Sequence, residues 1–136
     1  MLKLEKKVWP TFGSSLDMGL VGESIPMKRL RDQIKRIGPT DVSILISGES
    51  GTGKEAVARS IHKVSSRSHK PFMSVNCRAL SEQRFQAEVF GGENCADSGP
   101  SILEQADGGT VLFNDILTIS KEQQMNLLRF LQEGTL

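Results

Sequence analysis

A short stretch in the first half of the chain has the composition of a phosphate-binding loop. Its sequence is GESGTGKE, with three glycines and one lysine in eight residues. Glycines let the backbone adopt positive φ angles and approach a phosphate closely, so that successive N–H groups point at the anion. A lysine at this place reaches the β- and γ-phosphates of a nucleotide. The pattern predicts a nucleotide-binding P-loop made of Gly48, Glu49, Ser50, Gly51, Thr52, Gly53, Lys54 and Glu55.

The segments on both sides of this loop are those that a P-loop requires. Residues 42–47 (VSILIS) form an apolar, β-branched run that is predicted to be a buried strand. Residues 54–64 have Val57, Ala58 and Ile61 on one helical face. A helix starting at the loop would place the positive end of its dipole at the phosphates. A strand before the loop and a helix after it make a chance match to the motif improbable.

One position of the loop differs from the general pattern. Glu55 stands where a Ser or Thr hydroxyl usually contacts Mg²⁺. A carboxylate binds Mg²⁺ directly or through water, but it repels phosphates when the metal is missing. ATP and Mg²⁺ are therefore the expected ligands.

The rest of the sequence alternates between expected helices and strands. A helix is expected to begin after Ser24 and to end at Gly38 and Pro39, and strands are expected at residues 71–76 and 110–113. This alternation indicates an α/β fold with a parallel sheet, whose ligands bind at the carboxyl ends of the strands. Further helical segments are expected at residues 81–90, at residues 102–106, and from a capping box at Ser120 and Gln123 to Gly134.

The composition is that of a globular protein with one domain. The chain has 136 residues, of which 38% are hydrophobic and 24% are charged. The net charge of +1 gives no general basic field for nucleic acid, and no helix-turn-helix pattern is present, so direct DNA binding is not expected. No apolar run is long enough to cross a bilayer. Cys77 and Cys95 are expected to be free thiols, and the expected location is the cytoplasm.

From about Val21 onward, the sequence resembles the AAA+ domain of bacterial enhancer-binding proteins, the ATPases that activate sigma-54 RNA polymerase. A P-loop that ends in glutamate is characteristic of that family. Residues 1–20 are expected to be a linker or tail, and residues 21–136 the N-terminal portion of the ATPase domain. The other matching motifs are Val21-Gly22-Glu23-Ser24, Pro71-Phe72, Val75-Asn76-Cys77, Glu88-Val89-Phe90-Gly91, Ala106-Asp107-Gly108-Gly109-Thr110 and LLRFLQEG at residues 127–134.

The resemblance implies a role for several matching positions. The triphosphate and Mg²⁺ would be held by Gly51, Gly53, Lys54 and Glu55. Val21 and Gly22 would lie near the adenine, and Asn76 occupies the position of the switch asparagine that engages the Walker B glutamate. The implied fold is a P-loop NTPase (AAA+) parallel sheet flanked by helices, incomplete, with the lid subdomain missing.

The Walker B region departs from the family pattern. The family reads Gly-Gly-Thr, three apolar residues and Asp-Glu, whereas here the apolar residues are followed by Asn114 and Asp115. A shift by one residue would restore the aspartate but would reverse the faces of the strand. The carboxylate of Asp115 would lie roughly 1 Å from the place of the longer glutamate, and such a displacement lowers rates about 10²-fold. Asp115, Asn114 and Asn76 are the candidate catalytic residues, and Glu55 and Asp115 the candidate metal ligands.

Two more departures concern the sigma-54 contact and the length. The family places a GAFTGA motif soon after its Phe-Gly, but residues 91–100 (GGENCADSGP) lack the motif and are shorter. The sequence therefore argues against ordinary sigma-54 remodelling, although RNA polymerase or a sigma factor stays a candidate partner. The family's further strands and arginine fingers are not found, so residues 42–47 are expected to lose their sheet neighbours. A marginal fold or self-association is the expected result.

Three functions follow from these patterns. The favoured one is an ATP-binding regulatory domain with weak or defective hydrolysis, because arginine fingers contribute roughly 10³-fold or more to such reactions. The second is an active ATPase that works in an oligomer with Asp115 as its base. The third is a protein-interaction module that needs no nucleotide.

Overall fold

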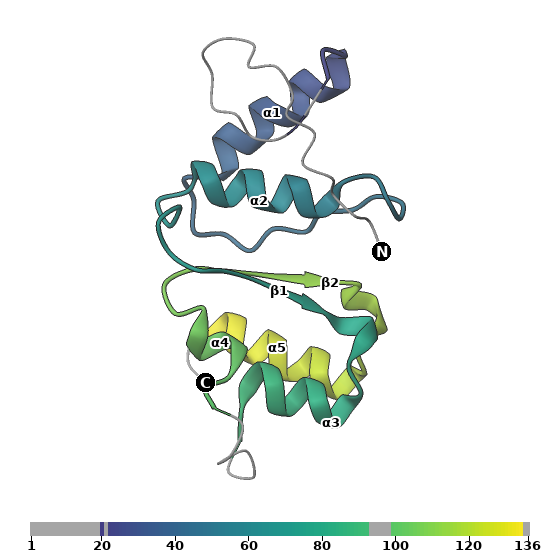
Figure 1. The fold of residues 1–136 in the computed structure, drawn as a ribbon, viewed down its shortest axis with the longest axis vertical. Helices are drawn as coiled ribbons and strands as arrows, with labels where there is room; N and C mark the ends of the chain where they lie inside the picture. Colours follow the sequence, from purple (N-terminus) through teal and green to yellow (C-terminus); the bar gives the residue numbers. More distant parts are fainter. Residues whose placement is uncertain (1–19, 21, 93–98, 135–136) are drawn as a thin grey trace.

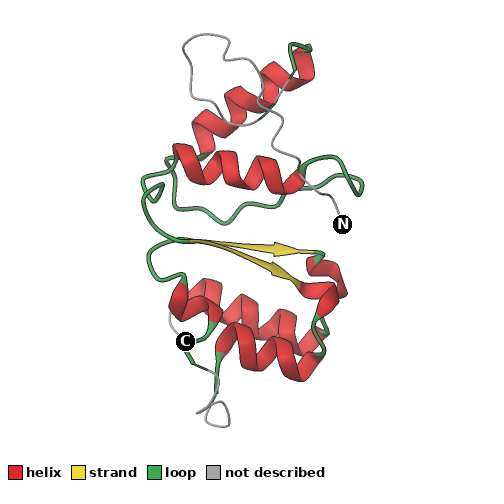
Figure 2. Ribbon diagram, in the orientation of Figure 1, coloured by secondary structure: helices red, strands yellow, loops and turns green. Residues whose placement is uncertain are grey.

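The computed structural model of the protein describes residue 20, residues 22–92 and residues 99–134. The expectations for Val21, for the tail at residues 1–19 and for Cys95 lie outside these residues. Two layers of helices cover the two faces of a small sheet, with α1 and α2 on one face and α3, α4 and α5 on the other (Figures 1 and 2). The predicted α/β class with a parallel sheet is confirmed. In the part of the chain that is described, no helix is long and apolar enough to span a membrane.

The helices of the first layer begin and end where the sequence predicts. They are α1 (Ile25–Ile37) and α2 (Lys54–Val64). The side chain of Ser24 caps α1 by accepting a hydrogen bond from the N–H of Met27, at 3.4 Å. A Cβ atom on Gly38 would lie 2.2 Å from Cγ2 of Val64. A glycine at the end of α1 therefore lets this helix approach the end of α2 closely.

The sheet has two parallel strands, β1 (Phe72–Asn76) and β2 (Thr110–Asn114). Its register runs from Phe72 opposite Thr110 to Asn76 opposite Asn114. Because side chains alternate between the faces of a strand, Phe72 and Thr110 face α2, where both contact His62. Val75 and Phe113 face the second layer and join its apolar core.

The second layer contains most of the buried residues. Its elements are α3 (Glu82–Phe85), a π-helical turn η2 (Gln86–Phe90), α4 (Ile102–Gln105) and α5 (Lys121–Glu133), and the short turns η1 (Cys77–Ala79) and η4 (Ile116–Thr118) follow the strands. Phe85 and Val89 are almost fully buried here. The capping box predicted at Ser120 and Gln123 is present, and α5 ends at Gly134, which has a φ of 68°. The π-helical geometry of residues 86–90 was not predicted.

The strand predicted at residues 42–47 is wrong. This segment forms no ladder with β1 or β2, and within the described residues its backbone has no hydrogen bond to other backbone groups. Its side chains are also not buried, since Val42 is 62% and Leu45 is 81% exposed. The physical reason is that a strand needs a neighbour to pair with, and none of the described residues pairs with this segment.

Candidate functional site

The P-loop connects residues 42–47 to α2, and its glycines adopt the geometry that the motif requires. Gly51 and Gly53 have φ angles of 80° and 89°, in the left-handed region that favours glycine. A Cβ atom at either position would meet nothing within 4 Å, so the backbone conformation, and not lack of space, selects glycine. Gly53 is the N-cap of α2, and no side chain caps the first turn of this helix among the residues described. The N–H groups of this turn therefore have no side-chain acceptor.

The side chain of Lys54 is held at this loop by backbone carbonyls. Its Nζ donates hydrogen bonds to the carbonyl oxygens of Gly48 and Glu49, both at 2.8 Å. The hydroxyl of Thr52 donates to the carbonyl of Glu49 at 2.7 Å and closes the loop. A Cβ atom on Gly48 would lie 2.9 Å from this hydroxyl oxygen, so glycine is needed for the approach. The result is a positive charge held beside the N-terminus of a helix, where anions bind favourably.

Glu55, the unusual residue of the motif, is engaged by an arginine one turn along α2. Its Oε1 lies 2.8 Å from Nη2 of Arg59, and the guanidinium of Arg59 lies 4.6 Å from the centre of the Phe72 ring. Only Oε1 of Glu55 is engaged in this pair, and in the part of the chain that the structure describes no hydrogen bond or ion pair occupies its Oε2. Among the described residues there is no cluster of three or more His, Cys, Asp or Glu side chains suited to a metal. Mg²⁺ in nucleotide sites takes several ligands from phosphate and water.

Asn76, the predicted switch asparagine, and Asn114 of the Walker B region lie opposite each other at the carboxyl ends of β1 and β2. The Oδ1 of Asn76 accepts a hydrogen bond from the N–H of Arg78 at 3.1 Å and so caps η1. The Nδ2 of Asn114 donates to the hydroxyl of Ser74 at 3.0 Å. Each amide is therefore engaged with β1 or the turn that follows it.

Asp115 has a backbone conformation that is rare for its residue type. With a φ of 55°, it is the only non-glycine residue with positive φ in the described part of the chain. Aspartate tolerates this conformation better than most residues, and such positions are common at functional sites. Its Oδ2 lies 3.8 Å from Nε of Arg78, so the carboxylate faces a positive charge.

The structure thus brings the predicted site residues together in two groups. Asn76, Asn114 and Asp115 gather where β1 and β2 end. The P-loop residues gather at the start of α2, in the layer on one face of the sheet (Figure 1). No hydrogen bond or ion pair links the two groups within the described ranges.

Two other residues with reactive side chains, His62 and Cys77, are buried in the fold. His62 is buried between α2 and the sheet, and burial lowers the pKa of its imidazole, with a nearby positive charge on Arg59 acting in the same direction. The free thiol of Cys77 is also buried, and burial raises its pKa to about 11. A thiol with this pKa is protonated at neutral pH, so Cys77 is not an activated nucleophile.

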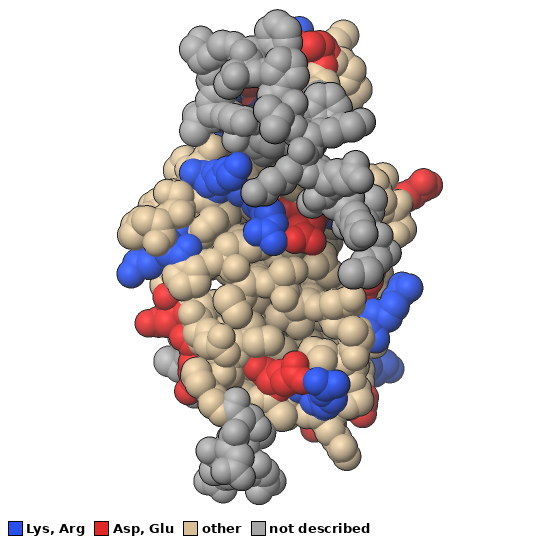
Figure 3. All heavy atoms as spheres, in the orientation of Figure 1, with Lys and Arg blue, Asp and Glu red and all other residues tan. Residues whose placement is uncertain are grey.

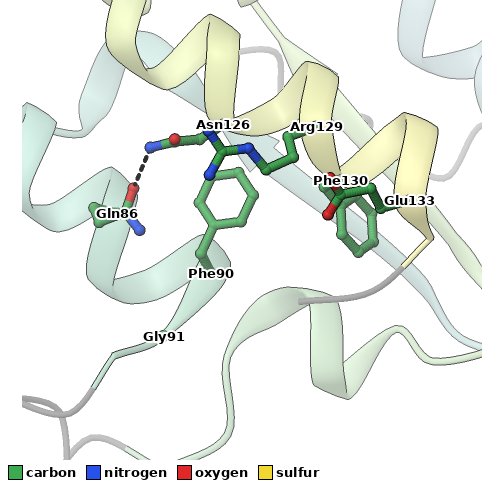
Figure 4. Close-up of a pocket in the computed structure, with 7 residues that line it drawn as sticks. All are labelled: Gln86, Phe90, Gly91, Asn126, Arg129, Phe130 and Glu133. Carbon is green, nitrogen blue, oxygen red and sulfur yellow. Dashed lines mark hydrogen bonds between the residues drawn. The ribbon is translucent and has the colours of Figure 1, made fainter.

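A separate hollow lies in the second layer, between η2 and α5 (Figure 4). Its volume is about 300 Å³. In Figure 4, the side chains of Gln86 and Asn126 point at one another across it and share a hydrogen bond of 3.1 Å. The hollow lies on the face of the sheet opposite α2, and the amide groups of Gln86 and Asn126 that line it are hydrogen-bonded to each other. The P-loop therefore remains the candidate site. The residues lining the hollow are Gln86, Phe90, Gly91, Asn126, Arg129, Phe130 and Glu133.

Comparisons with known proteins give matches over most of the chain. The family model of the Sigma-54 interaction domain matches residues 20–136. Transcriptional regulatory protein ZraR of Salmonella typhi is 42% identical over 125 residues, which cover 88% of this chain and 28% of that protein. A Nif-specific regulatory protein of Azotobacter vinelandii is 45% identical over 120 residues, which cover 85% and 23%.

Solved structures of a similar protein also match most of the chain. NtrX from Brucella abortus in complex with ADP matches with a TM-score of 0.77 and 39% identity, over 84% of this chain and 26% of that one. NtrX in complex with ATP matches with a TM-score of 0.75 and 40% identity, over 82% and 26%. This chain therefore spans about a quarter of the length of these relatives.

Proposed function

The chain belongs to the family of sigma-54 interaction domains, the AAA+ P-loop family that its motifs predicted, and on this premise we propose that it binds ATP as part of a transcriptional regulator and hydrolyses it weakly or not at all. The observation that carries the binding is the P-loop geometry: Gly51 and Gly53 have positive φ at the start of α2, with the ammonium of Lys54 beside them. The ADP and ATP complexes of NtrX support the proposal.

Binding would use groups that already lie at the start of α2. The phosphates would accept hydrogen bonds from the N–H groups of the loop and of the first turn of the helix. Lys54 would exchange its two carbonyl partners for phosphate oxygens, and hydrogen bonds between ionised groups are roughly twice as strong as neutral ones. Glu55 would offer Oε2, the oxygen that Arg59 does not engage, to a phosphate-bound Mg²⁺. Mg²⁺ would supply charge neutralisation at the phosphates when bound.

The proposed adenine contact lies before α1. Gly22 has a φ of 140°, and Arg31 of α1 donates hydrogen bonds to the carbonyls of Gly22 and Leu20. These contacts hold Leu20 and Gly22 against the helix. Val21 itself lies outside the described residues. We include both residues in the proposed adenine site on the strength of the family motif.

The proposed weakness in hydrolysis rests on the strand ends. Asn114 carries no charge and its amide donates to Ser74, so it supplies no carboxylate for a metal-bound water. The Asp115 carboxylate faces Arg78, which gives it a competing partner. A base must lie within hydrogen-bond reach of the attacking water, and a displaced carboxylate meets that requirement poorly.

Titration of a fluorescent ATP analogue in the presence of Mg²⁺ tests the binding. The Lys54→Ala variant is expected to bind at least about tenfold more weakly than the native chain, because it loses a charged phosphate contact. Lys121→Ala, which removes an exposed lysine from the start of α5, is the matched control and is expected to bind normally. Equal affinity of the native chain and Lys54→Ala would overturn the proposal and favour an interaction module that needs no nucleotide.

Phosphate release, measured on the same samples, tests the hydrolysis separately. The native chain is expected to show turnover near the background of the Lys54→Ala variant. Robust turnover that is lost in Asp115→Ala would contradict the proposed defect and would assign Asp115 as the base of an active ATPase.

Binding of RNA polymerase or of a sigma factor is to be measured with and without ATP, since the GAFTGA motif is missing and residues 93–98 lie outside the described part.

A further inference from the structure

Arg59 holds the carboxylate of Glu55 with two donors. Its Nε and Nη2 both donate to Oε1 of Glu55, at 3.1 Å and 2.8 Å. The two residues are four positions apart in α2, so their side chains meet across one turn of the helix. The contact cancels the two charges and fixes one carboxylate oxygen, while Oε2 stays outside the pair.

The sheet in turn fixes Arg59. Its guanidinium carbon lies 4.6 Å from the centre of the Phe72 ring at the start of β1, a distance at which a cation is attracted to an aromatic face. The Phe72 ring also contacts the buried ring of His62. Exposed ion pairs usually contribute little, because two long side chains must be ordered. Here Phe72 already orders one of them, so Arg59 is a defined holder of Glu55.

A carboxylate at the position of Glu55 conflicts with phosphate binding unless something holds it. Glu55 lies in the first turn of α2, directly after Lys54. Negative side chains in a first turn are attracted to its N–H groups and to the positive end of the helix dipole. These are the same groups that would bind phosphates. An unrestrained Glu55 would therefore compete with the phosphates and repel them whenever no metal ion lies between them.

The wider charge distribution does not remove this conflict. The net charge of the chain is +1, and Figure 3 shows Lys and Arg side chains interspersed with Asp and Glu side chains on the face that it draws. A broad field of one sign is what steers a charged ligand from a distance. With mixed charges, the arrangement of the few groups beside the loop decides how an anion is received.

We propose that Arg59 is a positioning residue for nucleotide binding, which draws the carboxylate of Glu55 along α2 and away from the groups that receive the phosphates. The inference deepens the proposed ATP binding and rests on it. Without metal, the nucleotide then meets Lys54 and the loop N–H groups with no competing carboxylate. With Mg²⁺, the metal ion itself compensates Glu55, so Arg59 matters less. Arg59 acts through Glu55 and does not touch the nucleotide.

Titration of a fluorescent ATP analogue into the full chain, once in EDTA and once in MgCl₂, tests this role. Arg59→Gln is expected to bind about fivefold more weakly than the native chain in EDTA, the upper range for an exposed charge pair. In MgCl₂ the same variant is expected to lose less than about twofold, because Mg²⁺ takes over the compensation of Glu55. A residue that only supports the fold would weaken binding equally in both conditions.

Two further variants separate the role of Arg59 from a general loss of charge. In a Glu55→Gln background, Arg59→Gln is expected to change binding in EDTA by less than about twofold, because no carboxylate remains to be held. Arg84→Gln is the matched control. It breaks another ion pair of residues four apart, with Arg84 Nη2 2.7 Å from Glu88 Oε1 on the opposite face of the sheet, and is expected to bind normally.

Far-UV circular dichroism establishes that each variant is folded. Should Arg59→Gln unfold, Arg59→Met takes its place, because methionine keeps an apolar contact with the Phe72 ring. Native binding confined to MgCl₂, unchanged binding by the Arg59 variant, a loss at least as large in MgCl₂ as in EDTA, or an undiminished loss in the Glu55→Gln background would overturn the role of Arg59 alone. A native chain that binds no analogue in either condition, or binds it no better than Lys54→Ala, would overturn the proposed ATP binding and this inference with it.

Discussion

The two faces of the sheet differ in how completely their residues are buried. On the face with α3, α4 and α5, the core includes Val75, Phe85 and Val89, each at most 3% exposed. On the face with α1 and α2, the buried apolar residues of these helices are Ile34 and Ala58, and the segment at residues 42–47 beneath them is exposed. The P-loop belongs to this second, less buried region.

This difference separates the part of the chain that provides most of its stability from the part that carries its proposed function. The region of α3–α5 contains β-strand pairing, aromatic contacts and two capping boxes. The region of α1 and α2 offers loop backbone and a charged lysine to a ligand. Regions with few buried apolar contacts open more easily, and ligand-binding loops are commonly found in them. ATP binding is therefore expected to stabilise α1 and α2 more than α3–α5.

The largest expected difference between the regions comes from truncating a core side chain. Phe85→Ala is expected to lower the free energy of unfolding by about 3–5 kcal/mol, because it leaves a cavity where Phe85 packs against Phe90 and Phe113. Leu45→Ala, at an 81% exposed position, is expected to change it by about 0.5 kcal/mol or less. Urea unfolding followed by circular dichroism measures both values. Equal losses would show that the two regions are equally packed.

The next largest effect on stability is expected from replacing one glycine in each region by alanine. A Cβ atom on Gly109 would lie 2.1 Å from the carbonyl oxygen of Pro71, where the chain enters β2. Backbone must move to admit it, so Gly109→Ala is expected to destabilise the fold by about 1–3 kcal/mol. On Gly38 the nearest atom belongs to the side chain of Val64, and shifting a side chain disturbs the fold less than shifting backbone. Gly38→Ala is therefore expected to have the smaller effect on the urea midpoint, and the reverse order would contradict this assignment.

The elements whose signals are local were predictable from the sequence. Ser24, Ser120 and Gly134 mark helix ends by hydrogen bonds and backbone angles formed within a few residues, and the structure has all three. Gly51 and Gly53 of the P-loop likewise adopt the positive φ angles that the motif requires. These features depend on neighbours in the sequence, so the sequence alone specifies them.

The features that depend on distant neighbours were less predictable. VSILIS has strong β-propensity, but a strand also needs a partner, and the described residues offer none. The π-helical turn at residues 86–90 ends at Phe90, whose ring packs against Phe130 of α5, a neighbour that is 40 residues away in the sequence. The engagement of Asn114 by Ser74 also depends on strand pairing, 40 residues away in sequence.

Helix caps give a smaller effect that again separates the regions. Ser120→Ala removes the capping box of α5, which packs on the main core, and is expected to lower global stability by about 1 kcal/mol. Ser24→Ala removes the corresponding cap of α1. Its effect is expected to be mainly local, as faster amide hydrogen exchange in the first turns of α1. A loss of global stability as large as that of Ser120→Ala would show that α1 unfolds together with the core.

The smallest expected effect concerns His62, which joins the two regions. Its Nδ1 lies 2.9 Å from Oγ1 of Thr110 in β2, and its ring centre lies 5.3 Å from that of Phe72 in β1. Burial and the charge of Arg59 lower the pKa of His62 below 6.5, although a hydrogen bond with the backbone of Lys70 partly opposes them. The unfolded chain therefore binds a proton more readily than the folded chain, so stability rises with pH through this range.

Acidification should for this reason weaken the attachment of α2 to the sheet before it affects the core. The free energy of unfolding is expected to fall as the pH drops below about 6.5, the ordinary pKa of histidine. In His62→Gln this part of the pH dependence should disappear, whereas His69→Gln, at an exposed position, should retain it. Hydrogen exchange at pH 7.5 and 5.5 then locates the change. Faster exchange is expected first in α2 and the P-loop, because protonated His62 must be solvated to be stable, and solvation requires α2 to separate from Thr110 and Phe72. If acid instead accelerated hydrogen exchange first in α3–α5, the contacts of His62 with Thr110 and Phe72 would not be what holds α2 to the sheet.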